Sequence, residues 1–126
     1  MKITHLDHLV LTVKNIDATC MFYEDVLGME VITFAENRKA LKFGQQKFNL
    51  HQAGNEFEPK ADKPKAGAID LCLISETPID TIIKELNSLK ISIIEGPVKR
   101  TGSTTDLISV YVRDPDKNLI EISNTL

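Results

Sequence analysis

The sequence predicts an α+β fold in which two pseudo-symmetric βαβββ modules form a cupped, barrel-like mixed sheet. One order of elements, a strand, a helix and three more strands, occurs twice along the 126 residues. A polar segment rich in Pro, Gly, Lys and Glu, residues 53–67, separates the two copies. We therefore expect one domain, with module one at residues 1–52, a linker at 53–67 and module two at 68–126.

Module one is expected to begin with a strand at Leu6–Val13, which is apolar on both faces and so suits a sheet covered on both sides. Asn15 or Asp17 can cap a helix that runs to about Leu27, and Gly28 suits the position after its end. Polar turn residues then separate three short strands, expected at Met29–Phe34, Lys39–Phe43 and Lys47–Gln52.

Module two repeats this order. Its first strand, Ala68–Ile74, is again apolar on both faces, and a helix follows with Thr77 as N-cap and Pro78 at its first position. The polar loop Lys99–Asp106 is expected to interrupt the remaining strands. These strands are expected at Ile91–Glu95, about Leu107–Arg113 and Asn118–Ser123.

Composition limits the classes of partner. The net charge is -3 and there is no basic block, which argues against nucleic acid. No apolar run approaches the roughly 20 residues of a membrane span, and we expect no membrane partner and a cytoplasmic location. Cys20 and Cys72 form no metal-type pair, so we expect reduced core thiols, with a nucleophile as the alternative.

The stretch Arg113–Ser123 joins a tight polar turn to a short strand. Pro115 fixes its own φ, and the neighbouring Asp side chains can bond the backbone further along. Glu121 is the one acid among the apolar residues of the strand. Because a buried carboxylate costs several kcal/mol unless it is paired or binds a metal, Glu121 is expected to have a partner.

The internal repeat suggests what this partner is. Superposing LDHLVL on AIDLCL matches His8 with Asp70, and superposing QKFNLHQ on DKNLIEI matches His51 with Glu121. Two imidazoles and two carboxylates from four strands predict a site for divalent Fe, Ni, Co, Zn or Mn rather than Ca. Four protein ligands would leave two positions of an octahedral ion for a substrate that chelates through two oxygens.

Each of these residues also has a purely structural interpretation. His8 alone could be a core histidine with satisfied hydrogen bonds, Asp70 could cap a helix or pair with a lysine, and Glu121 could form an ion pair. The coincidence of four such residues at related positions favours the metal. Asn49 lies on the same strand face as His51, so the fourth ligand is open between the two.

Three motifs, FYEDVLGMEV (22–31), GPVKRTG (96–102) and RDPDKNLIEIS (113–123), resemble those of the glyoxalase, bleomycin-resistance and extradiol-dioxygenase group, the vicinal oxygen chelate superfamily. The resemblance covers essentially the whole chain. It implies paired βαβββ modules around a divalent metal, often in homodimers. The ligand positions of the family correspond to His8, Asp70 and Glu121, with His51 as the fourth.

The sequence departs from the family pattern at three places. The first strand of the second module usually presents His, and here it presents Asp70. Matching the Glu-Leu-Thr run of glyoxalase I selects Asn49, whereas the internal repeat selects His51. Thr12 stands where glyoxalase I has an Arg for the carboxylate of glutathione, so Arg38, Arg100 or a lysine would have to replace it.

The leading hypothesis is a metal-dependent lyase or isomerase of the glyoxalase I (lactoylglutathione lyase) type. A small substrate with two adjacent oxygens, such as a glutathione adduct, would chelate the metal, and Glu121 would be the general base. Lys99 and Arg100 are candidates for a substrate carboxylate or phosphate, with solvated loop charges as the alternative, and Asn49 is a further candidate contact.

Two rival functions are kept open. An Fe(II) ring-cleaving dioxygenase normally needs two His and one Glu, and the additional carboxylate of Asp70 and the small size argue mildly against it. A metal-free protein that sequesters a planar drug is the other rival. An aromatic content of 6% with no Trp is low for stacking such a ligand.

Overall fold

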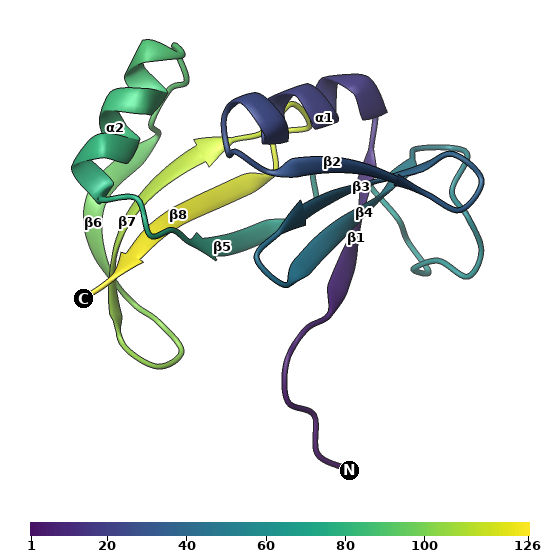
Figure 1. The fold of residues 1–126 in the computed structure, drawn as a ribbon, viewed down its shortest axis with the longest axis horizontal. Helices are drawn as coiled ribbons and strands as arrows, with labels where there is room; N and C mark the ends of the chain where they lie inside the picture. Colours follow the sequence, from purple (N-terminus) through teal and green to yellow (C-terminus); the bar gives the residue numbers. More distant parts are fainter. The chain divides into compact units, whose positions relative to one another are not determined.

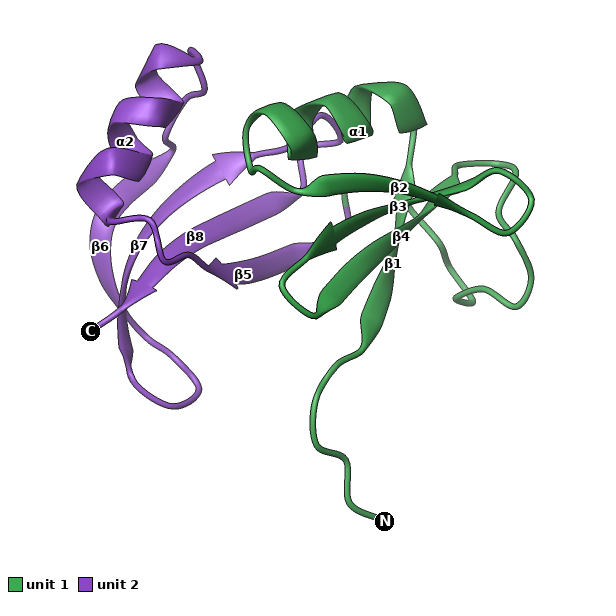
Figure 2. Cartoon of the chain, viewed as in Figure 1, with its two compact units in different colours: residues 1–67 green, residues 68–126 purple.

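The computed structural model describes all 126 residues, which form two compact units, residues 1–67 and 68–126 (Figure 2). Each unit contains one four-stranded mixed sheet and one helix, in the order strand, helix, three strands (Figure 1). The predicted α+β class and the repeated order are thus confirmed, but neither sheet closes into a barrel.

Unit 1 has a sheet with the strand order β1-β4-β3-β2, in which β1 and β4 are parallel and the other neighbours antiparallel. Its elements are β1 His8–Val13, α1 Ile16–Asp25, β2 Glu30–Phe34, β3 Arg38–Phe43 and β4 Gln46–Gln52. All five lie within a few residues of the predicted ranges. The alternation of apolar residues and the polar turns therefore determine this unit locally.

Helix α1 covers one face of this sheet. Asn15 caps it as predicted, because its Oδ1 accepts a hydrogen bond of 2.9 Å from the Ala18 N–H. Gly28 follows the helix with a φ of +69°, a conformation that glycine adopts without strain. Tyr23 of this helix is fully buried and meets Phe48 of β4 edge to face, with ring centroids 6.1 Å apart.

Unit 2 repeats the topology with the strand order β5-β8-β7-β6, and β5 and β8 are its parallel pair. Its elements are β5 Asp70–Ile74, α2 Ile79–Ser88, β6 Glu95–Thr101, β7 Asp106–Arg113 and β8 Leu119–Thr125. Ile82 and Leu86 of α2 are buried. Neither α1 nor α2 has the length and apolar character that crossing a membrane requires.

The strand predicted at Ile91–Glu95 was misplaced. The third-from-last strand is β6 at Glu95–Thr101, so Lys99 and Arg100 are strand residues and the polar loop is confined to residues 102–105. An edge strand pairs on one side only and tolerates charged side chains and proline, so its polar sequence resembles a loop. Within β6, position 96 requires glycine, because a Cβ there would lie 2.4 Å from the Ser109 carbonyl oxygen.

The predicted N-cap at Thr77 was also wrong. Helix α2 begins after Pro78, which offers no side-chain cap. Asn124 of β8 supplies it instead, because its Oδ1 accepts a 2.7 Å hydrogen bond from the Ile79 N–H. The Asn124 amide also donates to the carbonyl oxygens of Ser75 and Thr77. A residue 45 positions later in the sequence therefore fixes the start of this helix.

The turn between β7 and β8 is held by the buried carboxylate of Asp114. Asp114 Oδ1 accepts from the backbone N–H groups of Asp116 (2.9 Å) and Asn118 (3.0 Å), and Oδ2 accepts from the Asn118 amide at 2.8 Å. The Asn118 Oδ1 in turn accepts from the Ile69 N–H at 2.9 Å. The network thus joins the turn to the residue that precedes β5.

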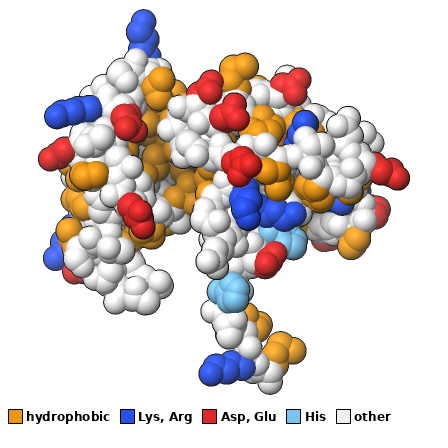
Figure 3. All heavy atoms as spheres, viewed as in Figure 1, with side chains coloured by type: hydrophobic (Ala, Val, Ile, Leu, Met, Phe, Trp, Pro, Cys, Tyr) orange, Lys and Arg blue, Asp and Glu red, His pale blue; other side chains and the backbone are white.

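Charged side chains of both signs are interspersed on the face of the molecule shown in Figure 3. This distribution accords with a net charge of only -3. That face carries no continuous basic surface.

Replacing Asp114 with Ala is expected to lower the free energy of unfolding by about 2–4 kcal/mol, because three donors lose their acceptor, two on the buried Asn118. Urea denaturation measures this change. The control is Asp106→Ala, which removes only an exposed ion pair with Lys99 and is expected to cost less than about 1 kcal/mol. Equal losses in the two variants would contradict the role of Asp114.

Candidate functional site

The residues predicted to bind a metal lie on the face of each sheet that the helix leaves uncovered. In β1 the buried Leu11 and Val13 alternate with His8, Val10 and Thr12. In β5 the half-buried leucines likewise alternate with the exposed Asp70, Cys72 and Ile74. The two units therefore offer equivalent faces, which we call the open faces.

The parallel strand pairs show which positions of the two units correspond. If His8 of β1 corresponds to Asp70 of β5, then Val10 and Cys72, two residues further along these strands, also correspond, and so do the residues that pair with them on β4 and β8. These pairs are Val10–Asn49 in unit 1 and Cys72–Glu121 in unit 2. Asn49 is therefore the counterpart of Glu121. The superposition that matched His51 with Glu121 was displaced by one pleat, because lysine spacing does not fix strand register.

Unit 1 does not bring His8 and His51 together. His8 pairs with Lys47 and His51 with Thr12, so the two histidines are offset by four residues, or roughly 13 Å along the strands. His8 and Asn49 are instead diagonal neighbours on one face, as Asp70 and Glu121 are in unit 2. No three side chains of the types His, Cys, Asp and Glu form a metal-binding group in the structure.

His8 is exposed, and its imidazole is oriented by the preceding residue. The Asp7 carboxylate lies 2.8 Å from His8 Nδ1, and this hydrogen bond is the main reason why the pKa of Asp7 lies below its ordinary value. A carboxylate only accepts, so Nδ1 carries the proton and the lone pair of the neutral ring is on Nε2. A histidine held in this way is suited to bind a metal through Nε2.

Asn49 carries an acceptor that the protein leaves unsatisfied. Its Oδ1 is buried and has no hydrogen-bond partner. Such an atom costs about 1–3 kcal/mol unless a donor or a cation reaches it. Imidazole, carboxylate and amide oxygens are all ligand types that divalent transition metals accept, so each of the four corresponding positions carries a side chain of a suitable type.

Glu121 is half-buried in the middle of the open face of unit 2. It is paired with Cys72 on one side and with Tyr111 on the other, and Ser123 Oγ lies 3.4 Å from its Oε1. No lysine or arginine of unit 2 forms an ion pair with it. The Tyr111 hydroxyl accepts a 2.9 Å hydrogen bond from Arg100 Nε. Glu121 is thus an accessible carboxylate with a phenol, a thiol and a hydroxyl around it.

The surroundings raise the pKa of two of these groups. Burial is the largest cause for the Tyr111 phenol, and the charge of Glu121 adds to it, while the hydrogen bond from Arg100 acts in the opposite direction. Cys72 is exposed as a residue, but partial burial of its thiol likewise raises the pKa of that group, with a further contribution from Glu121. Both groups therefore stay protonated near neutral pH and can donate hydrogen bonds.

Lys99 and Arg100 are engaged within unit 2. Lys99 Nζ lies 3.3 Å from the Asp106 carboxylate, and Arg100 Nη2 lies 3.2 Å from Glu95. Because Arg100 also donates to Tyr111, it is placed to orient the phenol beside Glu121 rather than to bind a substrate anion. Their assignment as substrate contacts stays a prediction.

The segment predicted as a linker instead covers the open face of unit 1. Phe57 packs edge to face on His51, with centroids 5.5 Å apart, and leaves His51 only 3% exposed. The Arg38 guanidinium stacks 4.2 Å from the Phe57 ring and 5.2 Å from the Phe34 ring, and its Nη2 donates to His51 Nε2 at 3.2 Å. Burial, and then the charge of Arg38, lower the pKa of His51.

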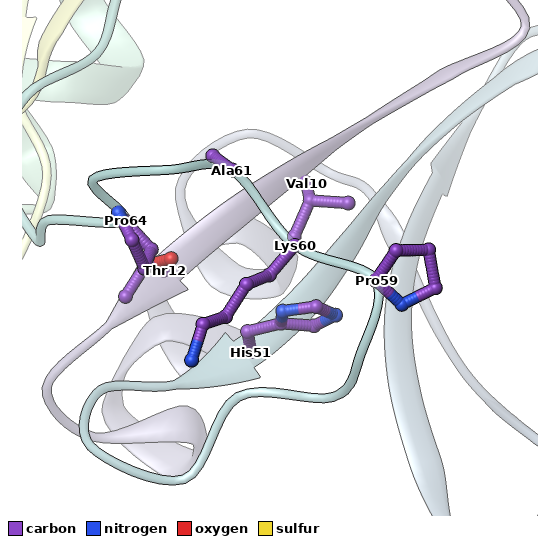
Figure 4. A pocket seen from close by; sticks show the side chains of 7 residues that line it. All are labelled: Val10, Thr12, His51, Pro59, Lys60, Ala61 and Pro64. Atoms are coloured by element: carbon purple, nitrogen blue, oxygen red, sulfur yellow. The ribbon is translucent and has the colours of Figure 1, made fainter.

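A cavity of about 440 Å³ lies between this segment and the open face (Figure 4). Its lining comes from β1, β4 and the segment 53–67 and comprises Val10, Thr12, His51, Pro59, Lys60, Ala61 and Pro64. A polar segment without apolar periodicity gave no reason to expect a pocket. The contacts of Phe57 with His51 and Arg38 hold this segment against the sheet.

Sequence reasoning missed Tyr111, and it missed the contacts of Arg38 with His51, Phe34 and Phe57. Tyr111 could have been found, because a tight turn at 114–118 places the residues two before Arg113 and two after Leu119 opposite each other. For Arg38 the sequence holds no comparable signal, since its environment consists of two rings from other segments and one imidazole.

Comparison with known proteins agrees with this architecture. A family model described as the Glyoxalase/Bleomycin resistance protein/Dioxygenase superfamily matches residues 5–122. Virulence protein STM3117 of Salmonella typhimurium is 58% identical over 123 residues, 98% of this chain and 85% of that protein. Its crystal structure superposes on the whole of both chains with a TM-score of 0.98 and 56% identity.

Two further proteins extend the comparison. Glyoxalase domain-containing protein RDO1 of Mycosarcoma maydis is 51% identical over 124 residues, which are 98% of this chain and 70% of that protein. A lactoylglutathione lyase from Agrobacterium tumefaciens is only 20% identical, with a TM-score of 0.75 over 98% of this chain and 96% of that one. At this identity the last comparison concerns the fold alone.

Replacing Phe57 with Ala is expected to release the segment 53–67. Losing the ring contacts with His51 and Arg38 should cost about 1.5 kcal/mol of local stability, so trypsin should cleave after Lys60 and Lys65 about tenfold faster. Timed proteolysis followed by mass spectrometry measures the rate. Asn55→Ala, at an exposed position of the same segment, is the control and should leave the rate unchanged.

Proposed function

The chain belongs to the glyoxalase/bleomycin resistance protein/dioxygenase superfamily, and from this premise we propose that it is a glyoxalase-like lyase or isomerase. Its substrate is a small molecule with two adjacent oxygens, and the reaction moves a proton between neighbouring carbons. The observation that carries the proposal is Glu121, a half-buried carboxylate with no cationic partner in its unit. Members of the superfamily bind small molecules, which supports a ligand at the open faces.

Glu121 is the proposed general base. A base must be reachable by the substrate and must not be neutralised by a permanent ion pair, and Glu121 meets both conditions. Tyr111 is the proposed positioning residue, because it faces Glu121 across the β7–β8 pair and is itself held by Arg100. The Tyr111 phenol can hold the Glu121 carboxylate in one orientation while Glu121 takes up and returns the proton.

We propose that a divalent ion (Ni, Zn, Co, Fe or Mn) is bound by His8, Asp70 and Glu121, and that Glu121 would be displaced from the ion, or lie at its edge, when it acts as the base. When bound, such an ion polarises adjacent substrate oxygens and increases the acidity of the carbon-bound proton. Asn49 is favoured over His51 as the fourth donor. Asn49 Oδ1 lacks a partner, whereas His51 Nε2 already accepts from Arg38, whose positive charge 3.2 Å away opposes a second cation.

Two assays distinguish the proposed lyase or isomerase from a dioxygenase and from a binding protein of the same superfamily. Oxygen uptake with catechols would indicate a ring-cleaving dioxygenase. Stoichiometric binding of a planar compound to metal-free protein, without turnover, would indicate a binding protein. A homodimer in the cytoplasm, in line with the dimers frequent in the superfamily, is part of the proposal.

Replacing Glu121 with Gln is expected to lower turnover of methylglyoxal and glutathione by about 10²–10⁴-fold, because the amide cannot accept the proton. The change preserves shape, so the thermal unfolding midpoint should stay within a few degrees. Spectrophotometric rates and circular dichroism measure the two. The control is Glu76→Gln, an exposed acid of unit 2, which should be fully active. Full activity of Glu121→Gln would exclude it as the base.

Metal binding is expected to depend on His8 and Asn49 but not on His51. Equilibrium dialysis against Ni²⁺ should show at least about tenfold weaker binding for His8→Ala and Asn49→Ala, and an unchanged affinity for His51→Gln. Asp7→Ala should weaken binding by about 10–100-fold, because the imidazole loses the hydrogen bond that orients it. Loss of metal in His51→Gln with retention in Asn49→Ala would reverse the assignment of the fourth donor.

A further inference from the structure

We propose that the cavity between β1, β4 and the segment 53–67 binds the carboxylate group of a small molecule, with Lys60 and His51 as the donors. The inference deepens the proposed function, because it names a chemical group of the substrate. Its role as a substrate pocket rests on the proposed function, whereas binding of the carboxylate can be measured without turnover.

The size and lining of the cavity fit a small organic molecule. About 440 Å³ is within the range of roughly 300–1,000 Å³ that small-molecule sites occupy. Val10, Pro59, Ala61 and Pro64 give apolar walls, while the polar groups of Thr12, His51 and Lys60 reach the same space (Figure 4). Such a lining suits a short carbon chain that ends in one charged group.

His51 offers one defined donor to this space. Arg38 can only donate, so the hydrogen bond at 3.2 Å makes His51 Nε2 the acceptor and places the proton of the neutral ring on Nδ1. No protein acceptor binds Nδ1. Nδ1 is also not one of the side-chain atoms that are both fully buried and without a hydrogen-bond partner. The Nδ1–H group is therefore open to the cavity that the ring borders.

The charge behind His51 favours an anion. The Arg38 guanidinium has no carboxylate partner, its Nε is buried without a hydrogen bond, and Phe34 and Phe57 shelter it from water. A sheltered charge is screened less than an exposed one. The charges of Glu56 and Glu58 act on His51 in the direction opposite to that of Arg38. Glu56 is half-buried, whereas Glu58 is well exposed, so the field of Glu58 is weakened by solvent.

Lys60 supplies the mobile charge. Its Nζ lies 3.2 Å from Glu58, with side chains that are 36% and 72% exposed. Exposed pairs of this kind contribute about 0–1 kcal/mol, so a ligand carboxylate can replace Glu58 at little cost. One ammonium and one N–H group match the two oxygens of a carboxylate, whereas a phosphate dianion with three oxygens would leave acceptors unpaired.

The experiment titrates the full-length protein with propionate, its uncharged analogue propionamide and inorganic phosphate, followed by isothermal calorimetry and by amide NMR shifts. Propionate should saturate at millimolar concentrations, with shifts at residues 10–12 and 59–64, and should bind at least about tenfold more tightly than either other probe. Lys60→Gln should weaken propionate about tenfold. Lys63→Gln, an exposed lysine of the same segment outside the cavity lining, should not.

Arg38 is a positioning residue in this scheme. Arg38→Gln should reduce the preference for propionate over propionamide, whereas a merely structural defect would weaken both equally. Equal affinity for propionate and propionamide in the wild type, tighter binding of phosphate, or equal losses in Lys60→Gln and Lys63→Gln would overturn the proposal.

The two proposals fail separately. Propionate binding in the Glu121→Gln variant after metal chelation tests the cavity alone, and persistence there supports it whether or not turnover is found. Turnover that depends on Glu121 in a protein that does not bind propionate would overturn the cavity proposal and leave the proposed function intact.

Discussion

The buried carboxylate of Asp114 is the interaction on which the open face of unit 2 depends. It closes the turn between β7 and β8, and through Asn118 it also bonds the residue before β5. One network therefore sets two registers, antiparallel β7–β8 and parallel β5–β8. Because side chains alternate along a strand, a slip of one residue in either register would turn Glu121 toward the helix side. The alignment of Cys72, Glu121 and Tyr111 in one row is a consequence of this turn.

Unit 1 has the same topology as unit 2, but the side chains on its open face differ. At the position that corresponds to Glu121 it has Asn49, which is buried and has an unsatisfied oxygen. One pleat further, Phe57 and Arg38 enclose His51. The repeat thus provides equivalent positions, and the segment 53–67 makes one face sheltered and cationic.

The elements could be predicted because their signals are local. Asn15, Gly28 and the alternating strands of unit 1 act through neighbours within a few residues, so the expected and observed ranges nearly coincide. The errors arose where a distant residue decides. Asn124 replaces Thr77 as the cap of α2, and β6 forms from a polar sequence because it pairs with β7. The register between β1 and β4, which separates His8 from His51, is likewise a property of the assembled sheet.

His51 illustrates why residue type alone does not assign a role. An imidazole on a strand next to another candidate ligand suggested that His51 binds a metal. The side chains around His51 oppose metal binding. The guanidinium of Arg38 occupies the Nε2 lone pair and adds a positive charge, which disfavours a cation there and favours an anion at Nδ1. His8 has the opposite neighbour, the Asp7 carboxylate, which leaves Nε2 free and favours a cation. Two histidines on one sheet face are thus suited to opposite charges, because one is backed by Arg38 and the other by Asp7.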